Sequence, residues 1–253
     1  MNLRSDLVPL VDADIITYRC GFAAKGEPLS HVLQTVKTSM DNIYELFCDA
    51  PRQPMVYLTG KDNYREYVAV TRPYKGNRDP NAKPEFYKEI RQYLQDYHGA
   101  IMVDGMEADD ALGVEQWSRK DRDTVIVSID KDLLCIPGYH YNFVRNEFRY
   151  VTLKEANRCF WTQVLTGDST DNIEGLPKYG EKTAQKVLAG VPDTWEDLYV
   201  AVKNEYNKVY GDEAEEKFRE MATLVWILRE PNTNFDGTPI VKEEECTTSS
   251  EQP

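Results

Sequence analysis

Eight carboxylates in four separate segments are the residues of this chain whose types and spacing could do chemistry. They are Asp12 in "VDAD", Glu107, Asp109 and Asp110 in "GMEADD", Asp130 and Asp132 in "SIDKD", and Asp168 and Asp171 in "GDSTD". Oxygen-only ligands suit Mg²⁺ or Mn²⁺, whereas the three histidines are isolated in the sequence, which disfavours zinc. Two hard cations held close together can activate a water and stabilise the leaving oxygen in phosphodiester hydrolysis.

Each acidic segment also has an ordinary structural explanation when it is taken alone. Acids at the start of a helix act as caps, and an Asp after a strand is a common turn residue. Brought close together, however, eight carboxylates would repel one another strongly unless cations neutralised them. A metal site is therefore predicted only if the fold gathers all four segments.

Short apolar runs predict the elements that would gather them. Residues 7–14, 54–60 and 123–130 read as buried parallel strands, and 100–106 as a shorter strand. Helix-like segments, of which 29–47 is the longest, lie between them. This alternation predicts an α/β fold, a mostly parallel twisted sheet flanked by helices. Because ligands bind at the carboxyl ends of such strands, we expect all eight acids at one edge of the sheet.

The stretch "GDSTDNIEGLPKYGEKTA" (167–184) has two competing interpretations. A phosphate-cradling P-loop needs G-x-x-x-x-G-K-[ST] between a strand and a helix. Here Glu181 comes between the second glycine and the lysine, and the preceding segment 152–167 reads as a helix. The alternative is a glycine-bearing turn between two helices. Backbone N–H groups at the start of the second helix could then face a phosphate, with Lys178 and Lys182 beside it.

Composition and charge bound the remaining possibilities. The chain has 253 residues, 41% of them apolar, which is enough for one large domain with a real core. The net charge of −13 looks wrong for a nucleic-acid binder, but residues 61–91 carry a local balance of +3. Five scattered cysteines predict neither a disulfide framework nor zinc and favour a reducing cytoplasm. The sequence has no apolar run of membrane-spanning length, and we expect no export signal.

The order of four motifs, "VDAD", "GMEADDALG", "SIDKDLL" and "GDSTDNIEGLPKYGEKTA", resembles the flap endonuclease and 5′→3′ exonuclease family. The segment "YREYVAVTRPYKGNRDPNAKPEFY" resembles the family's arch. The resemblance covers roughly residues 8–230 and is closest to free-standing bacteriophage 5′→3′ exonucleases, including the T7-like type. It implies a PIN-like metal-dependent nuclease core, a helical arch over the active site, and a helix–three-turn–helix DNA clamp.

The resemblance also implies roles for individual residues. Asp12, Glu107, Asp109 and Asp110 match ligands of a first metal, and Asp130, Asp132, Asp168 and Asp171 match outer or second-metal ligands. Lys75 and Arg78 in "YKGNR" match the arch's basic pair at the scissile phosphate, and three-residue spacing on a helix would point both the same way. Tyr18 resembles the aromatic residue on which the family stacks a terminal base. The other implied DNA-binding residues are Arg65, Arg72, Gly175, Lys178, Gly180, Lys182 and Thr183.

Two departures from the family pattern matter. The family often has an aspartate where the second strand ends, but this chain has Gly60 there and Asp62 two residues later. Asp62 is one candidate substitute, and the loss of a ligand is the other possibility. The hairpin usually reads G-[IV]-G, whereas Lys178 replaces its first glycine. That change would affect how closely the hairpin backbone approaches a phosphate, or it would alter a K⁺ site that the family can form there.

The expected function is a two-metal 5′→3′ exonuclease on duplex DNA, with flap endonuclease and RNase H-like activity on RNA–DNA hybrids. The alternatives are a non-catalytic protein that binds branched DNA and a PIN-like ribonuclease. The predicted organisation is a nuclease core over 1–150 with its arch at about 61–98, a helix–three-turn–helix region over 151–230, and a partly flexible end over 231–253. A role in DNA replication in the cytoplasm of a bacterial host is expected if the chain is of phage origin. The sequence does not predict an oligomeric state.

Overall fold

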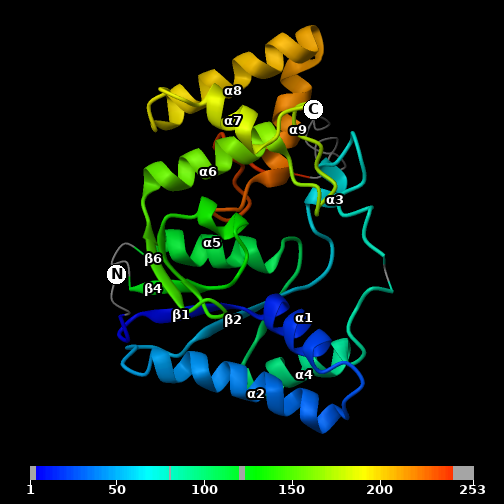
Figure 1. The fold of residues 1–253 in the computed structure, drawn as a ribbon, viewed down its shortest axis with the longest axis vertical. Helices are drawn as coiled ribbons and strands as arrows, with labels where there is room; N and C mark the ends of the chain where they lie inside the picture. The colour runs from blue at the N-terminus through cyan, green and yellow to red at the C-terminus, as the bar shows by residue number, and fades with distance from the viewer. Residues whose placement is uncertain (1–3, 80, 120–122, 242–253) are drawn as a thin grey trace, which may run out of the picture.

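A six-stranded sheet forms the centre of the chain (Figure 1), in a computed structural model that describes residues 4–79, 81–119 and 123–241. The strand order is β3-β2-β1-β4-β5-β6, and all neighbouring strands are parallel except the antiparallel pair β5–β6. The strands are β1 Val8–Asp12, β2 Met55–Thr59, β3 Ile101–Val103, β4 Thr124–Val127, β5 Gly138–Asn142 and β6 Glu147–Val151.

The predicted fold class, a mostly parallel sheet flanked by helices, is confirmed. Each of the four predicted strands is present within its expected range, although β3 is only three residues long. The hairpin formed by β5 and β6 was not predicted, because neither strand has a continuous apolar run. After β1, the strands β2 and β3 are added on one side of it, and the chain then crosses back so that β4 pairs with the other side of β1. This reversal of strand order opens a crevice at the carboxyl ends of β1 and β4.

Helices cover both faces of the sheet. On one face, α1, α2 and α4 bury the apolar side chains of β1, β2 and β4, and on the other α5 packs against the same strands. The helices of this part are α1 Ala13–Ala23, α2 Leu29–Leu46, α3 Arg65–Val68, α4 Tyr87–His98, α5 Ala108–Ser118 and the 3₁₀ turn η1 Asp132–Cys135. Among the described residues of the segment expected as a helical arch, α3 and α4 are helical, and turns lie between them.

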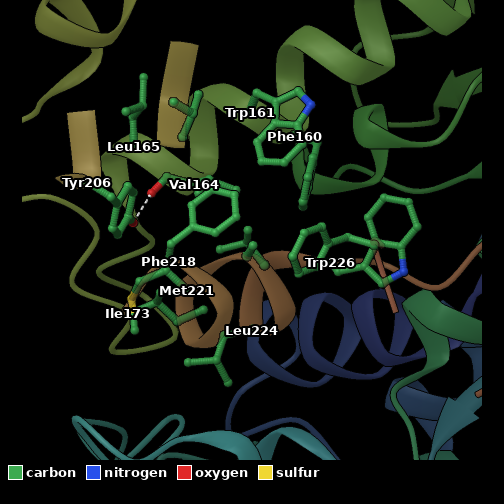
Figure 2. Packing of buried hydrophobic residues seen from close by; sticks show 14 of the residues in the cluster. Phe160, Trp161, Val164, Leu165, Ile173, Tyr206, Phe218, Met221, Leu224 and Trp226 are labelled. Carbon is green, nitrogen blue, oxygen red and sulfur yellow. Dashed lines mark hydrogen bonds between the residues drawn. The ribbon is translucent and has the colours of Figure 1, made fainter. Parts of the chain in front are cut away.

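A helical layer lies beyond α5 and is built around aromatic side chains (Figure 2). Phe160 and Trp161 of α6 meet edge to face at 4.7 Å between ring centroids, and Trp161 stacks on Phe218. The buried hydroxyl of Tyr206 donates to the carbonyl of Val164 at 2.6 Å, which satisfies the one polar atom of that ring. The elements of the layer are α6 Leu153–Thr166, α7 Glu181–Val187, α8 Trp195–Tyr210, the 3₁₀ turn η2 Gly211–Glu213 and α9 Ala214–Val225.

This helical layer shares its core with the sheet half of the molecule. Tyr64 and Cys135 pack into the same apolar cluster as α6, α8 and α9, and Tyr64 donates to the carbonyl of Trp226 at 3.0 Å. Phe235 is also buried there and the neighbouring Asn234 is buried too, so this part of the segment after α9 packs against the helical layer. Of the end predicted to be partly flexible, 231–253, residues 242–253 lie outside the described residues. None of the described helices combines the length and apolar character that crossing a bilayer requires.

Candidate active site

Two adjoining clefts lie at the carboxyl edge of the sheet. The first has a volume of about 360 Å³ and is lined by Asp12, Asp14, Glu107, Asp109 and Asp130, among others. The second is small, about 40 Å³, and is lined by Asp132, Asp168 and Asp171 together with the same Glu107 and Asp109. Seven of the eight predicted carboxylates therefore meet around two neighbouring spaces, as the sheet topology led us to expect.

Asp12 is positioned by both elements that it joins. It ends β1 and caps α1, so one carboxylate oxygen accepts from the amide of Ile15 at 3.1 Å. The other oxygen accepts from the hydroxyl of Ser128, just after β4, at 2.7 Å. Burial, together with the nearby charges of Asp14 and Asp130, raises the pKa of Asp12 to about 7, although the two hydrogen bonds act in the opposite direction.

Glu107 and Asp109 stand at the start of α5 and border both clefts. Burial alone would raise the pKa of Glu107, but the charges of Lys75 and Arg65 outweigh it, so this pKa lies below its ordinary value. The pKa of Asp109 is raised well above its ordinary range, first by burial and then by Asp12 and Asp130. A neighbouring cation therefore decides which of the two carboxyls is held as an anion.

Asp130 and Asp132 follow β4 in a short turn. The backbone amide of Asp132 donates to the Asp130 carboxylate at 2.9 Å. The Asp132 carboxylate accepts from the side-chain amide of Gln163 on α6 at 2.5 Å. Burial, then the charges of Asp130 and Asp168, raises the pKa of Asp132 to about 7, and burial raises that of Asp130 as well.

Asp110 does not belong to this group, and its predicted role as a metal ligand is wrong for this geometry. Its fully buried carboxylate forms a two-pronged ion pair with Arg65, at 2.6 and 2.9 Å. It also accepts from the backbone amides of Glu107 and Leu228, both at 3.0 Å. These four donors occupy the acceptor positions of both carboxylate oxygens, so Asp110 holds α3, α5 and the segment after α9 together.

The predicted role of Arg65 in DNA binding is wrong for the same reason. Its guanidinium is 3% exposed and, besides Asp110, donates to the carbonyls of Leu224 and Trp226. A buried guanidinium with all of these partners cannot reach a nucleic-acid backbone. Arg72, by contrast, is exposed and pairs with Glu174 of the hairpin loop at 2.7 Å.

The basic pair Lys75 and Arg78 lies over the acidic clefts, but not on a helix. Residues 74–77 form a turn in which Lys75 has a left-handed φ of 54°, so the expected helical spacing is wrong. The turn places both cations nonetheless: Lys75 pairs with Glu107, and Arg78 pairs with Asp171. The backbone amide of Lys75 donates to the carbonyl of Asp171 at 2.9 Å, which ties the turn to the hairpin loop.

Tyr74 in the same turn was missed by sequence reasoning. Its hydroxyl lies 2.9 Å from a Glu107 oxygen and 2.8 Å from an Asp171 oxygen, so it links the two clefts. Asp14 was also missed, although it stands in the quoted "VDAD". It lines the first cleft, accepts from the amide of Thr59 at 2.9 Å and pairs with Arg91. Only the fold reveals that Arg91, on α4, reaches this edge.

The departure at Gly60 has a steric explanation. A Cβ atom on Gly60 would come within 2.0 Å of the carboxylate of Asp104, which follows β3. Position 60 therefore has no room for an aspartate while Asp104 holds this place. Asp62 is exposed at the rim of the first cleft with a φ of 60°.

Tyr18 and Tyr87 line the first cleft together with the acidic residues. Tyr18 is half-buried, with its ring centroid 5.5 Å from that of Tyr87 and 6.1 Å from that of the exposed Phe22. These three rings form an aromatic rim beside the acidic residues. Such a rim offers a flat apolar face to a nucleobase.

The hairpin between α6 and α7 brings Asp168 and Asp171 to the second cleft. Gly175 is required structurally, because a Cβ there would lie 2.3 Å from the amide nitrogen of Gly167. Lys178 has a φ of 69°, so it keeps the left-handed backbone that glycine adopts more easily. Gly180 has open space around it and precedes α7, where Lys182 is exposed and Thr183 is half-buried.

The donor set fits hard divalent cations. The acidic cluster offers carboxylate oxygens to both clefts. Burial, and then the charges of neighbouring carboxylates, raises the pKa values of Asp12, Asp109, Asp130 and Asp132, so bound cations would stabilise their anionic forms. Among the described residues no three of these groups already form a ready-made coordination sphere. Lys75 and Arg78 balance part of the charge instead.

Comparison with known proteins agrees with this geometry. A 5′-3′ exonuclease of Buchnera aphidicola (Schizaphis graminum) is 24% identical over 219 residues, which cover 79% of this chain and 73% of that protein. The thermostable DNA polymerase I of Thermus filiformis is 26% identical over 201 residues, 72% of this chain. The chain spans only 23% of that polymerase's length. No family model matches the chain.

The fold is also that of a solved phage protein. The T5 D15 protein, crystallised with metal ions, aligns with a TM-score of 0.60 at 15% identity, over 86% of this chain and 88% of that one. The same T5 protein, described as a flap endonuclease in a complex with DNA and metal ions, aligns with a TM-score of 0.57. The sheet, its flanking helices and the hairpin therefore share the fold of this T5 protein. The chain is thus similar in sequence to 5′-3′ exonucleases and has the fold of the T5 protein.

Proposed function

We propose that this chain is a divalent-metal-dependent 5′→3′ exonuclease that acts on duplex DNA, with flap endonuclease activity. The observation that carries the proposal is the pair of adjoining acidic clefts beneath a basic turn. Seven carboxylates from four distant segments meet there, beside an aromatic rim and a glycine hairpin. The relatives that match most of their own length are named 5′-3′ exonucleases.

We assign the cations to two adjoining subsites. Asp12, Asp130, Glu107 and Asp109 border the first, and Asp132, Asp168 and Asp171 complete the second. Divalent cations bound there would supply an activated water and neutralise the phosphate oxygens during hydrolysis. Two ions, and Mg²⁺ or Mn²⁺ as their identity, are our proposal from the carboxylate-only donor set.

Residues of the chain itself would position the DNA. Lys75 and Arg78 would leave Glu107 and Asp171 to pair with the scissile phosphate, where they stabilise the charge that grows during cleavage. Tyr18 would stack the terminal base at the aromatic rim. Arg72 and the hairpin, with Lys178, Gly180, Lys182 and Thr183, would contact phosphates and set the register of the duplex.

One experiment tests both catalysis and substrate class. Duplex DNA, a 5′ flap and an RNA–DNA hybrid, each labelled at the 5′ end, are incubated with Mg²⁺ and then with chelator. We expect short 5′ products from the duplex and flap with Mg²⁺ alone. Binding without cleavage would favour the branched-DNA-binding alternative, and cleavage of RNA alone would favour the PIN-like ribonuclease. Activity on the hybrid, K⁺ at the hairpin and a cytoplasmic location stay predictions.

A further inference from the structure

Two thiols lie side by side behind the second cleft. Cys135 ends η1 and Cys159 lies in α6, and their sulfur atoms are 3.1 Å apart. Both are free thiols. Cys135 is 1% exposed, whereas Cys159 is half-buried. Nothing in the proposed cleavage reaction uses either sulfur.

A short chain of contacts connects this thiol pair to the acidic cluster. The Cys135 sulfur also lies 3.1 Å from the side-chain oxygen of Gln163. The amide nitrogen of the same Gln163 donates to the Asp132 carboxylate at 2.5 Å. Because Asp132 begins the single 3₁₀ turn that Cys135 ends, the two residues are also coupled through four residues of backbone.

We propose that Cys135 and Cys159 form a reversible disulfide that weakens cation binding at the Asp132 subsite. The oxidant class is a hydroperoxide, and a thiol reductant reverses the bond. What is regulated rests on the proposed nuclease function, but formation of the disulfide does not.

The oxidation balances with one hydroperoxide. The Cys159 thiol gives up its proton and the thiolate attacks a peroxide oxygen. The O–O bond breaks and the leaving oxygen takes up that proton, which gives a sulfenic acid and an alcohol (water from H₂O₂). The Cys135 sulfur then attacks the Cys159 sulfur, the S–O bond breaks, and water leaves with the Cys135 proton. Two thiols are oxidised by two electrons and one peroxide is reduced.

The new bond changes the surroundings of Asp132 in two ways. A disulfide holds its sulfurs at about 2.05 Å, so the two sulfurs must move about 1 Å closer, by rotation of the two side chains or by a shift of η1 against α6. The Cys135 sulfur also loses its proton and can no longer donate to Gln163. Gln163 is then free to turn, and Asp132 loses the donor that fixes its carboxylate. Losing such an outer partner typically lowers metal affinity by about 10- to 100-fold.

The first test is chemical and needs no nuclease activity. The full chain carrying Cys48→Ser and Cys246→Ser, which removes an exposed cysteine and one outside the described residues, is treated with H₂O₂. Peptide mapping should find residues 135 and 159 in one cross-linked species that dithiothreitol separates. Cys159→Ser should give no cross-link. A treated protein whose Cys135 and Cys159 are recovered only as separate peptides would overturn the proposal.

The second test measures the Mg²⁺ concentration that gives half-maximal cleavage and half-maximal thermal stabilisation. Both should rise at least about 5-fold on oxidation and recover with dithiothreitol, within the range expected for an outer partner. Cys159→Ser should keep the reduced value throughout. Gln163→Leu should show the raised value while reduced, with little further change on oxidation. A cross-linked protein with an unchanged Mg²⁺ requirement would contradict the coupling, whereas an inactive reduced protein would contradict the proposed function alone.

Discussion

At the scale of single residues, the neighbours Asp109 and Asp110 have different roles, the first at the candidate metal site and the second in a buried ion pair. Asp109 faces both clefts with a pKa raised by burial and by Asp12 and Asp130, whereas Asp110 is neutralised by Arg65. Asp109→Asn should abolish cleavage and leave the metal-free melting temperature unchanged or higher, because it removes repulsion. Asp110→Asn should cost about 3 kcal/mol of stability, because it leaves a buried guanidinium unpaired.

Thermal unfolding and single-turnover cleavage of the two variants, measured side by side, check this difference. Each variant is the control for the other, since both replace one carboxylate by an amide on the same helix turn. If Asp110→Asn kept wild-type stability and Asp109→Asn unfolded the protein, the two assignments would be reversed.

Lys75 tests whether the basic turn acts on the phosphate or only neutralises acids. Lys75→Ala should lower the single-turnover rate at saturating enzyme by at least about 30-fold, because a cation on the scissile phosphate contributes about 3 kcal/mol to the transition state. DNA affinity should change by less than about 5-fold. Lys88→Ala, at an exposed lysine on α4, is the matched control.

Arg78→Ala should behave in the same way, and the double variant should lose less than the product of the two, since both residues act on one phosphate. A Lys75→Ala variant with weaker DNA binding and a normal saturated rate would mean that Lys75 only steers DNA.

At the scale of elements, the hairpin and α7 should bind DNA without taking part in the chemistry. Lys182 is exposed at the start of α7. Lys182→Ala should weaken duplex binding and reduce the slope of log K against log salt by about one unit, because one phosphate contact is lost. The saturated cleavage rate should stay close to wild type. Titrations at several salt concentrations measure the slope, and an unchanged slope would place Lys182 away from the duplex.

The elements were predictable to different degrees, for physical reasons. The strands that carry Asp12 and Asp130 could be predicted because parallel strands buried on both faces need continuous apolar runs. The turn at Lys75 could not, because its left-handed backbone is held by contacts with Asp171, far along the chain. Nor could sequence separate Asp109 from Asp110, since the partner that distinguishes them, Arg65, comes from another element.

At the scale of the whole molecule, the gathered acids make stability depend on pH and on cations together. The folded pKa of Asp12 and of Asp132 is about 7, above the ordinary 3.8. These groups therefore favour the folded state at low pH, and that contribution is lost as pH rises through about 7. Cations compete with these protons, so the rise in melting temperature caused by Mg²⁺ should be larger at about pH 8 than at about pH 5.5.

Thermal unfolding with and without Mg²⁺ at matched ionic strength measures this difference. Burial lowers the pKa of His140 to about 4. This residue affects the melting temperature equally with and without Mg²⁺, so its effect cancels in the difference. A Mg²⁺ effect that shrank as the pH rose would contradict the clustering of these carboxylates.

The central claim, that this acidic edge cleaves DNA with the help of cations, is tested most directly by single-turnover cleavage of a 5′-labelled duplex with Asp130→Asn. Asp130 borders the first cleft, follows β4 and contacts no basic side chain through a described hydrogen bond or ion pair. The account predicts a rate at least about 10²-fold lower at saturating Mg²⁺, with DNA affinity unchanged or higher because one repulsive charge is gone. The exposed Asp212→Asn should match wild type. An Asp130→Asn enzyme that cleaves at the wild-type rate would contradict the account.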